Sequence, residues 1–184
     1  MKLQNIVEIK TGLPLSRKKG EKFEYKLLTL KCFQNDSIYL NPNCLDTFIA
    51  NEKLDDYIAN SGDIVVRLRV PIKAIYITKD VLVPSTMVIL KAKKKIDMKF
   101  LTYYLNSKIS KKALSKNIEG SLIKMVGSKD LKNIKISLPP LNIQQKIAKT
   151  LLLIDKEIEL LDKLQKEKKI LKDIILERLS NDKK

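Results

Sequence analysis

Residues 138–161 read LPPLNIQQKIAKTLLLIDKEIELL, and this stretch divides the chain into two parts of different character. Before it lie short apolar runs bounded by Gly, Pro, Asn or Asp, which are typical of strands. The adjacent prolines cannot continue a strand ladder. After them, helix formers dominate, and no Gly or Pro occurs between Ile143 and Leu179. The sequence therefore predicts an α+β fold, with a mixed, β-rich domain at residues 1–140 and a long C-terminal coiled-coil helix within residues 141–184.

The predicted helix carries an apolar seam. Asn142 is a candidate N-cap, and Gln145 completes a capping-box-like pair with it. Apolar residues then recur alternately four and three apart, the coiled-coil spacing, and they resume after a polar stretch at 165–169. The seam residues are Ile147, Leu151, Ile154, Ile158, Leu161, Leu171, Ile175 and Leu179. A helix of about 37 residues is roughly 55 Å long, which exceeds the width of a small domain. We therefore expect the seam to pair with a helix of a second chain. The alternative is a helix that lies wholly on its own domain.

The first 140 residues are predicted to form several strands and one helix. The strand candidates are Tyr25–Phe33, Ile38–Leu40, Asp63–Val70, Ile72–Thr78, Val81–Leu90 and Asn133–Leu138. Val70-Pro71 is expected to separate the third candidate from the fourth. Asp97 is expected to cap a helix whose core-facing residues are Phe100, Leu101, Tyr104 and Leu105. Two Gly-Ser pairs between 117 and 130 predict an exposed loop, either functional or a plain connector.

The composition excludes several kinds of active site. None of the 184 residues is His, which removes Ser–His and Cys–His nucleophile pairs and imidazole zinc sites. Cys32 and Cys44 are too few for a disulfide scaffold or a metal cluster, so we expect two buried thiols in a reducing compartment. The N-terminus has no apolar signal core, and no apolar run approaches the ~18 residues that cross a bilayer. We expect a cytoplasmic protein without membrane contact.

The charge indicates a polyanionic partner. The chain has 37 Lys+Arg against 21 Asp+Glu, a formal net charge of +16. Residues 1–140 contain 26 of the basic and 13 of the acidic residues, so the excess lies in the predicted globular domain. Abundant Lys, Ile and Asn are also expected wherever coding DNA is AT-rich, which weakens the signal. Charge by itself leaves nucleic acid as one open possibility.

Motifs for catalysis are missing from the sequence. The five glycines form no GxGxxG or GxxxxGK[ST] pattern, and the Pro-Pro pair lacks the preceding Asp or Asn of adenine methyltransferases. Glu8-Ile9-Lys10 and Glu24-Tyr25-Lys26 resemble half of a nuclease metal site, but no Asp precedes either of them. We expect a non-catalytic protein without metal or cofactor of its own.

The proline-to-helix segment resembles the conserved region of the DNA-specificity subunits of type I restriction–modification enzymes. In that family a Leu-x-x-Ile-x-Ile-x-Leu-Pro-Pro-Leu exit leads into a Gln-x-x-Ile-Ala helix start. The matching residues here are Leu131, Ile134, Ile136, Leu138-Pro139-Pro140-Leu141, Gln145, Ile147 and Ala148. Weaker likenesses are Val7–Gly12, Ser61–Val65 and Phe100–Leu105, so the resemblance spans nearly the whole chain.

The resemblance implies a target-recognition domain that reads DNA and a helix that sets the distance to a second such domain. It also implies docking of adenine methyltransferase subunits, which would bind S-adenosylmethionine, and indirect association with a restriction subunit. Family members usually hold two recognition domains and two helical regions, whereas this chain has one of each. We therefore expect a half-length subunit that binds one half-site of a bipartite double-stranded DNA target and forms a homodimer through its helix. The alternative is a truncated interaction protein that pairs with a full-length specificity subunit and alters or blocks its assembly.

Scarce arginines guide the prediction of DNA contacts. Arg67 and Arg69 alternate along a predicted strand and would point to one face, and Arg17 follows a Gly12-x-Pro14 turn. Because Arg suits bidentate contact with guanine, these three are expected to contact bases or phosphates. Phosphate contacts are expected from Lys10, Lys18, Lys19, Lys22 and Lys73, with weaker contributions from Ser121 and Lys124. The alternatives are an ion pair on the strand for the arginines and a solvated surface for the lysines.

Overall fold

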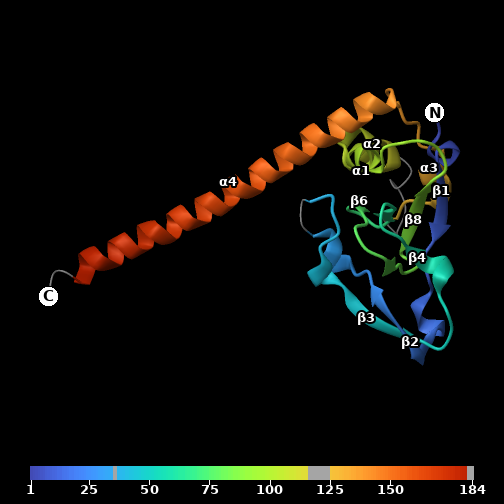
Figure 1. Cartoon of the computed structure of the whole chain (residues 1–184), viewed down its shortest axis with the longest axis horizontal. Coiled ribbons are helices and arrows are strands. Elements are labelled where there is room, and N and C mark those ends of the chain that lie inside the picture. The colour runs from blue at the N-terminus through green and yellow to red at the C-terminus, as the bar shows by residue number, and fades with distance from the viewer. Residues whose placement is uncertain (35–36, 116–124, 182–184) are drawn as a thin grey trace. The chain divides into compact units, whose positions relative to one another are not determined.

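The computed structural model describes residues 1–34, 37–115 and 125–181, without the side chains of Arg17 and of residues 179–181. Contacts divide the chain into two units, Met1–Ala148 and Lys149–Lys184. In the described residues, the first unit holds two four-stranded sheets and three short helices, and the second continues one long helix. These elements confirm the predicted α+β class with a long C-terminal helix (Figure 1).

The first sheet has the strand order β1-β8-β5-β6, and all its neighbouring strands are antiparallel. Its strands are β1 (Val7–Thr11), β8 (Met87–Ala92), β5 (Ile64–Arg67) and β6 (Lys73–Tyr76). The second sheet has the order β3-β2-β7-β4 and includes a parallel pair between β2 and β7. Its strands are β3 (Asp46–Ala50), β2 (Lys19–Leu27), β7 (Val81–Leu82) and β4 (Ile58–Ala59).

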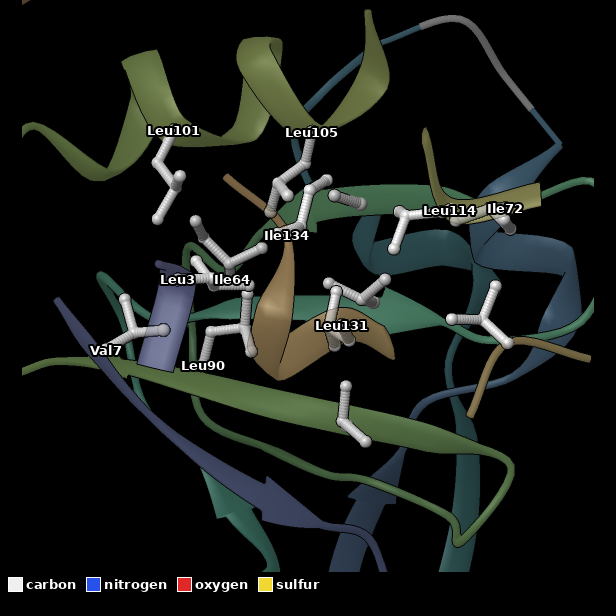
Figure 2. Packing of buried hydrophobic residues seen from close by; sticks show 14 of the residues in the cluster. Leu3, Val7, Ile64, Ile72, Leu90, Leu101, Leu105, Leu114, Leu131 and Ile134 are labelled. Atoms are coloured by element: carbon white, nitrogen blue, oxygen red, sulfur yellow. The ribbon is translucent and has the colours of Figure 1, made fainter. Parts of the chain in front are cut away.

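Buried side chains cover both faces of the first sheet. On one face, Ile64, Val66 and Leu90 pack with residues of the helices α1 (Met98–Asn106), α2 (Lys108–Ser115) and α3 (Ser128–Asn133), as Figure 2 shows in part. On the other face, Val65 and Ile89 pack with residues from the segment after β2 and from β7. Because both faces are covered, Ile64–Val66 of β5 and Met87–Leu90 of β8 are buried without interruption, whereas the edge strand β1 carries Glu8 and Lys10.

Helix α1 follows the prediction. The Asp97 carboxylate accepts a hydrogen bond of 2.8 Å from the Phe100 amide, which confirms the N-cap. Phe100, Leu101 and Leu105 are buried, and Tyr104 packs against the same core at partial exposure. At the end of α1, the Asn106 side-chain amide donates to the Ala74 carbonyl (2.8 Å) and accepts from the Ala74 amide (2.9 Å). The outer edge of β6 is thereby satisfied at that position.

Several predicted strand boundaries are wrong. The candidate Val81–Leu90 is two strands, because Pro84 has no amide hydrogen and the chain crosses there from the second sheet to the first. The candidate Tyr25–Phe33 corresponds to β2, which ends at Leu27 and is followed by a 3-10 turn at Leu30–Phe33. The Val70-Pro71 break is confirmed, since β5 ends before it and β6 begins after it.

Two further strand candidates make only isolated bridges. Ile38–Leu40 joins β6 through a bridge between Tyr39 and Tyr76. Asn133–Leu138 is bonded to the N-terminal residues, with the Leu3 amide donating to the Ile134 carbonyl at 3.0 Å. Strands β1, β3 and β4 were not predicted, since they are short or carry charged residues.

Part of the predicted Gly-Ser loop is helical. Residues 116–124 lie outside the described part of the chain. Beyond them, helix α3 begins at Ser128, directly after Gly127. Its residue Leu131 is fully buried, and this burial stabilises the helix against the core. The prediction of a loop is therefore wrong for residues 128–130.

The long helix α4 (Leu141–Asn181) begins one residue before the predicted cap, so Asn142 is not its N-cap. The residue that anchors its start is Gln144, which is 4% exposed. Its side chain donates to the Pro139 carbonyl (2.8 Å) and accepts from the Asp97 amide (3.1 Å). Counting three residues back from Ile147 also gives Gln144, which corrects the position assigned to the motif's glutamine. Among the described residues, no helix is long and apolar enough to cross a membrane.

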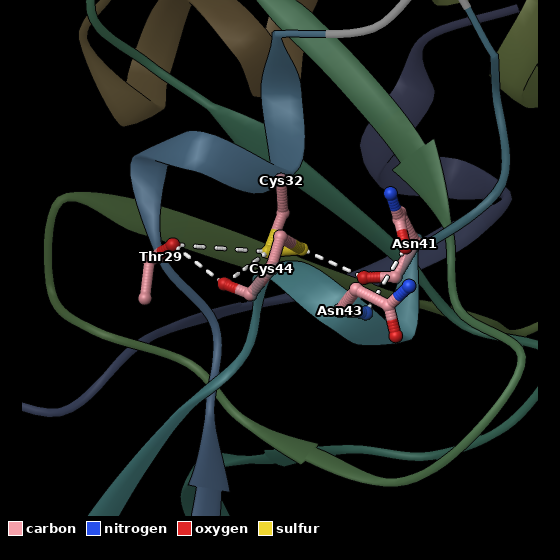
Figure 3. Close-up of a disulfide and its surroundings, with 5 residues drawn as sticks. All are labelled: Thr29, Cys32, Asn41, Asn43 and Cys44. Carbon is pink, nitrogen blue, oxygen red and sulfur yellow. Dashed lines mark hydrogen bonds between the residues drawn. A yellow bond between two sulfur atoms is a disulfide. The ribbon is translucent and has the colours of Figure 1, made fainter.

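The two cysteines form a disulfide, which corrects the prediction of two free thiols (Figure 3). Cys32 and Cys44 are 12 residues apart in sequence, and their Cα atoms are 5.1 Å apart. The Thr29 hydroxyl donates a hydrogen bond of 2.8 Å to the Cys44 carbonyl. The intervening chain turns back through two 3-10 turns, a path that the sequence pattern did not predict.

Candidate nucleic-acid interface

The strand directions bring four connecting segments to one end of the first sheet. Strands β1 and β5 end there, and β8 and β6 begin there. Two features connect these segments. One is a backbone bridge between Leu13 and Pro84. The other is a hollow of about 320 Å³ that is lined by Leu15, Leu27–Leu30 and Pro84–Met87. We call residues 10–17, 28–34, 67–73 and 83–87 the Arg67 end.

The Arg67 end has a one-sided charge. Its four segments contain six basic residues and neither Asp nor Glu. The basic residues are Lys10, Arg17, Lys31, Arg67, Arg69 and Lys73. A surface with one sign of charge attracts a polyanion, and phosphate contacts of Lys and Arg supply much of the affinity for nucleic acid.

The opposite end of the same sheet, residues 60–63, 77–80 and 91–97, is charged differently. We call it the Asp63 end. Lys91 forms an ion pair of 2.6 Å with Asp63 and also donates to the Asn60 side chain (2.8 Å). Asp80 accepts from the Ser61 amide at 3.0 Å, and Asp97 caps α1. Asp63 thus holds Lys91, and Asp80 and Asp97 hold backbone amides, while Lys79, Lys93, Lys94 and Lys95 of this end are exposed.

Arg67 occupies a distinctive position at the last residue of β5. It lies directly opposite Lys73 on β6 and Met87 on β8, so the three side chains share one face of the sheet. The side chain is partly buried, and its Nη2 donates to the Val70 carbonyl at 3.3 Å. Its Nε is buried and has no hydrogen-bond partner among the described residues.

The structure places two other predicted contacts at the Arg67 end. Arg69 is exposed and forms a backbone bridge with Met125, so it lies in the turn after β5. The expectation that Arg67 and Arg69 alternate on one strand is therefore wrong, because the strand ends at Arg67. Lys10 is partly buried near the end of β1.

Other predicted contacts lie elsewhere or outside the described residues. Lys18 is paired with Glu52, and this hydrogen bond raises the pKa of its ammonium group above the ordinary 10.5. Lys19 and Lys22 are exposed near the start of β2, away from Leu27. The side chain of Arg17 lies outside the described part of the structure, as do Ser121 and Lys124.

Sequence reasoning missed three exposed polar residues at the Arg67 end. Ser85 and Thr86 lie in the β7–β8 turn, and Lys31 lies in the 3-10 turn after β2. Pro84 could have indicated the turn that contains Ser85 and Thr86, because a proline interrupts a strand ladder. The prediction instead treated residues 81–90 as one strand. Among the described residues, no group of three His, Cys, Asp or Glu residues is placed to hold a metal ion.

Helix α4 exposes apolar side chains. Of the predicted seam, Ile147 in the first unit and Ile154, Ile158, Leu161, Leu171 and Ile175 in the second are exposed, and Leu151 is partly buried. The side chain of Leu179 lies outside the part of the chain that the structure describes. A second set of exposed apolar residues, which was not predicted, lies at Leu153, Leu160, Leu164 and Ile174, where Glu157 and Glu167 interrupt the coiled-coil spacing. One helix cannot cover its own apolar rows, so both rows are available to other helices.

Sequence comparison shows which known proteins the chain resembles. Residues 1–171 match the family model described as type I restriction modification DNA specificity domain. Over 96% of its length the chain is 32% identical to the type I restriction enzyme MjaVIII specificity subunit of Methanocaldococcus jannaschii, and it covers 44% of that protein. Over 76% of its length it is 32% identical to the putative type I restriction enzyme MjaX specificity subunit of the same organism, and it covers 32% of that protein. The chain thus spans less than half the length of these relatives.

Solved structures share the fold. A chain from a study of complex assembly and conformational transition of the type I R-M system has a TM-score of 0.67 at 22% identity, over 91% of this chain and 40% of that one. The HsdS subunit from Thermoanaerobacter tengcongensis has a TM-score of 0.64 at 21% identity, over 90% of this chain and 39% of that one. Because the family model matches most of the chain, this protein belongs to the family of type I restriction–modification DNA specificity domains.

Proposed function

We propose that this chain is a non-catalytic sequence-recognition subunit that binds one half-site of a bipartite double-stranded DNA target through its Arg67 end. The observation that carries the proposal is the set of six basic residues that the topology gathers at that end, in four segments that themselves contain neither Asp nor Glu. Family membership supports the same conclusion. Phosphate contacts would position the domain, and base contacts would specify the sequence.

Individual contacts follow from the same arrangement. Arg17, Arg67 and Arg69 would contact bases or phosphates. Lys10 and Lys73 belong to the Arg67 end and would bind phosphates, while Lys18, Lys19 and Lys22 would extend the phosphate track along β2. Ser121 and Lys124 belong to this set by sequence alone.

The proposal includes a homodimer. The seam on α4 would pair with the same seam of a second copy, with the two helices antiparallel about a two-fold axis. The length of the chain supports a second copy as the partner of the seam. The chain covers 44% of one relative, and a second copy would supply a second domain and helix. Two recognition domains would then read inverted half-sites whose separation depends on the helix length.

The second apolar row would dock an adenine methyltransferase subunit. That partner would bind S-adenosylmethionine and carry out the chemistry, and a restriction subunit would associate through it. We place the assembly in the cytoplasm, where its DNA is. The rival proposal is an interaction protein whose helix pairs with a full-length specificity subunit and alters its assembly. It needs the same seam but not selective DNA binding by this domain.

The first experiment measures the mass of the purified chain by light scattering at low and high salt. A dimer that persists in high salt supports self-pairing through the seam, because apolar contacts are not screened by ions. In parallel, the chain is incubated with a randomised 20-base-pair duplex pool, and the bound fraction is sequenced. A selected motif supports the recognition subunit. A monomer that selects no motif would contradict it and favour the interaction protein.

A further inference from the structure

The coiled-coil spacing on α4 is symmetric about Leu161. The seam is interrupted at residues 165–169, and Leu164 and Lys168 connect its two halves at coiled-coil spacing. We call the connected set the α4 row, and its members are Ile147, Leu151, Ile154, Ile158, Leu161, Leu164, Lys168, Leu171 and Ile175. The successive steps are four, three, four, three up to Leu161 and three, four, three, four beyond it. The row therefore reads the same in both directions from Leu161.

The centre of this symmetry is also a break in the regular pattern. A coiled-coil seam alternates steps of three and four, whereas two steps of three meet at Leu161. Such a break changes the local winding of a coiled coil, so a partner helix must carry a matching break at the same level. Leu161 is exposed, as are the other apolar members of the row except Leu151, which is partly buried. The row thus has contact surface left for a partner along its whole length.

A second copy supplies the matching break in one antiparallel alignment. When a two-fold axis passes through Leu161, this residue meets its own counterpart, and each other member meets the member equally far away on the opposite side. The facing pairs are Ile147 with Ile175, Leu151 with Leu171, Ile154 with Lys168, and Ile158 with Leu164. Any other antiparallel alignment places the break of one helix against regular spacing in the other. Centred on Leu161, the two copies of α4 overlap over their whole described length, since Leu161 is the middle residue of Leu141–Asn181.

The charged member of the row favours the antiparallel direction. In a parallel pair in register, each residue faces its own counterpart, so two Lys168 ammonium groups would lie in one layer of the seam and repel each other. In the antiparallel pair, Lys168 faces Ile154 instead. Its alkyl stem can cover the isoleucine while its ammonium group stays in water.

We infer that the α4 row is a self-complementary interface in which two copies of this chain pair antiparallel with Leu161 on the two-fold axis. The inference rests on the proposed function, because it assigns the alignment of the proposed homodimer. A helix of a different protein requires no symmetry in the row, so the symmetry favours a second copy as the occupant. Leu164 then belongs to this interface, and Leu153, Leu160 and Ile174 are left for another partner.

The first test measures a distance in the full chain. Both cysteines of the chain are joined in the disulfide, so Lys149→Cys provides one thiol for a spin label at an exposed position outside the α4 row. Position 149 precedes Leu161 by 12 residues. Two labels in the dimer are therefore about 24 residues apart along the helix pair, or about 36 Å, which double electron–electron resonance measures. A parallel pair would bring the labels within about 20 Å, and a displacement by one heptad would change the distance by about 10 Å.

Disulfide trapping tests the facing pairs. Under mild oxidation, Leu161→Cys should shift the 21.1 kDa chain to twice that mass on a non-reducing gel, because counterparts in one core layer are within reach of a disulfide. Leu151→Cys and Leu171→Cys should each stay at 21.1 kDa alone and shift when the two variants are co-expressed. Glu159→Cys is the matched control. Two residues from Leu161, it lies on the opposite side of the helix and should not shift.

The outcomes separate the alignment from the function beneath it. A monomeric mass by light scattering would refute the homodimer and the inference together. A dimer in which Leu151→Cys is trapped with itself, or in which the label distance is near 20 Å, is parallel and overturns the inference. A dimer whose label distance differs from 36 Å by about 10 Å or more has another alignment and overturns it as well. Selection from the randomised duplex pool tests DNA recognition by the domain, and it depends on none of these results.

Discussion

The two ends of the first sheet show opposite treatments of charge. At the Asp63 end, a lysine is matched to a carboxylate and to an amide oxygen, and the remaining acids hold turns and cap a helix. At the Arg67 end, an arginine faces a lysine, and the surrounding segments contain no acid. Both ends belong to the same four strands, so the difference in charge lies in the residues at the strand ends and in the connecting segments. Charges that are compensated within the chain stabilise the fold, and we propose that the basic residues of the four segments without Asp or Glu bind a ligand.

Charge reversal at the Arg67 end should give the largest effect. Arg69 is exposed, so Arg69→Glu would remove the proposed phosphate contact and add repulsion without disturbing the core. Affinity for duplex DNA should fall about tenfold or more, and the slope of log affinity against log salt should become shallower by about one. Fluorescence anisotropy with a labelled duplex at several salt concentrations measures both quantities.

The matched control for this variant lies at the other end of the sheet. Lys79 is exposed just after β6, and Lys79→Glu makes the same type of change at the Asp63 end. It should alter the affinity only slightly, through the net charge of the domain. Equal losses in the two variants would show that binding depends on overall charge and that the Arg67 end has no special role.

The second prediction concerns Gln144, which lies near the Asp63 end. Gln144→Ala removes two hydrogen bonds and leaves the Asp97 amide and the Pro139 carbonyl without this partner. The free energy of unfolding, measured in urea, should fall by about 2 kcal/mol, because the Asp97 amide and the Pro139 carbonyl remain desolvated without a hydrogen-bond partner. DNA affinity at low urea should be unchanged. Exposed Gln145→Ala is the control, and it should leave stability close to the wild-type value.

The third prediction concerns the ion pair between Lys91 and Asp63 at the Asp63 end. Lys91→Ala leaves Asp63 without its cation in a partly buried setting, although Asp63 still accepts from the Asn60 amide at 2.8 Å. Stability should fall by about 1 kcal/mol. The DNA affinity of the folded variant should stay within about twofold of the wild type, since this charge is already compensated. A large loss of DNA affinity with unchanged stability would reverse the roles assigned to the two ends.

Local patterns predicted part of this architecture well. The coiled-coil spacing, the absence of Gly and Pro, and the Asp97 cap depend on neighbours within a few residues, and they gave α4 and the start of α1. The Val70-Pro71 break was predictable for the same reason.

Features set by distant neighbours could not be read from the sequence. The pairing of Arg67 with Lys73, the crossing of the chain at Pro84 and the joining of Cys32 to Cys44 all depend on which segments meet. The choice of Gln144 over Gln145, by contrast, could have been read from the sequence, because the Gln-x-x-Ile spacing that ends at Ile147 gives Gln144, and the structure buries that residue.

The smallest expected effect comes from Lys18, which adjoins the Arg67 end but is already paired. The hydrogen bond to Glu52 raises the Lys18 pKa above 10.5, so the pair contributes its stability fully below pH 10.5 and loses it as the pH rises through the folded-state pKa. Lys18→Gln should therefore reduce DNA affinity less than Arg69→Gln does.

The partner of that ion pair offers the sharpest comparison. Glu52→Gln frees the Lys18 ammonium and should raise DNA affinity about twofold, because it converts a compensated charge into an available one. Anisotropy titrations of both variants at pH 7 measure the two changes against the wild type. If Lys18→Gln is as damaging as Arg69→Gln, and Glu52→Gln changes nothing, compensation within the chain does not decide which lysines bind DNA. The contrast between the two ends of the sheet would then rest on position alone.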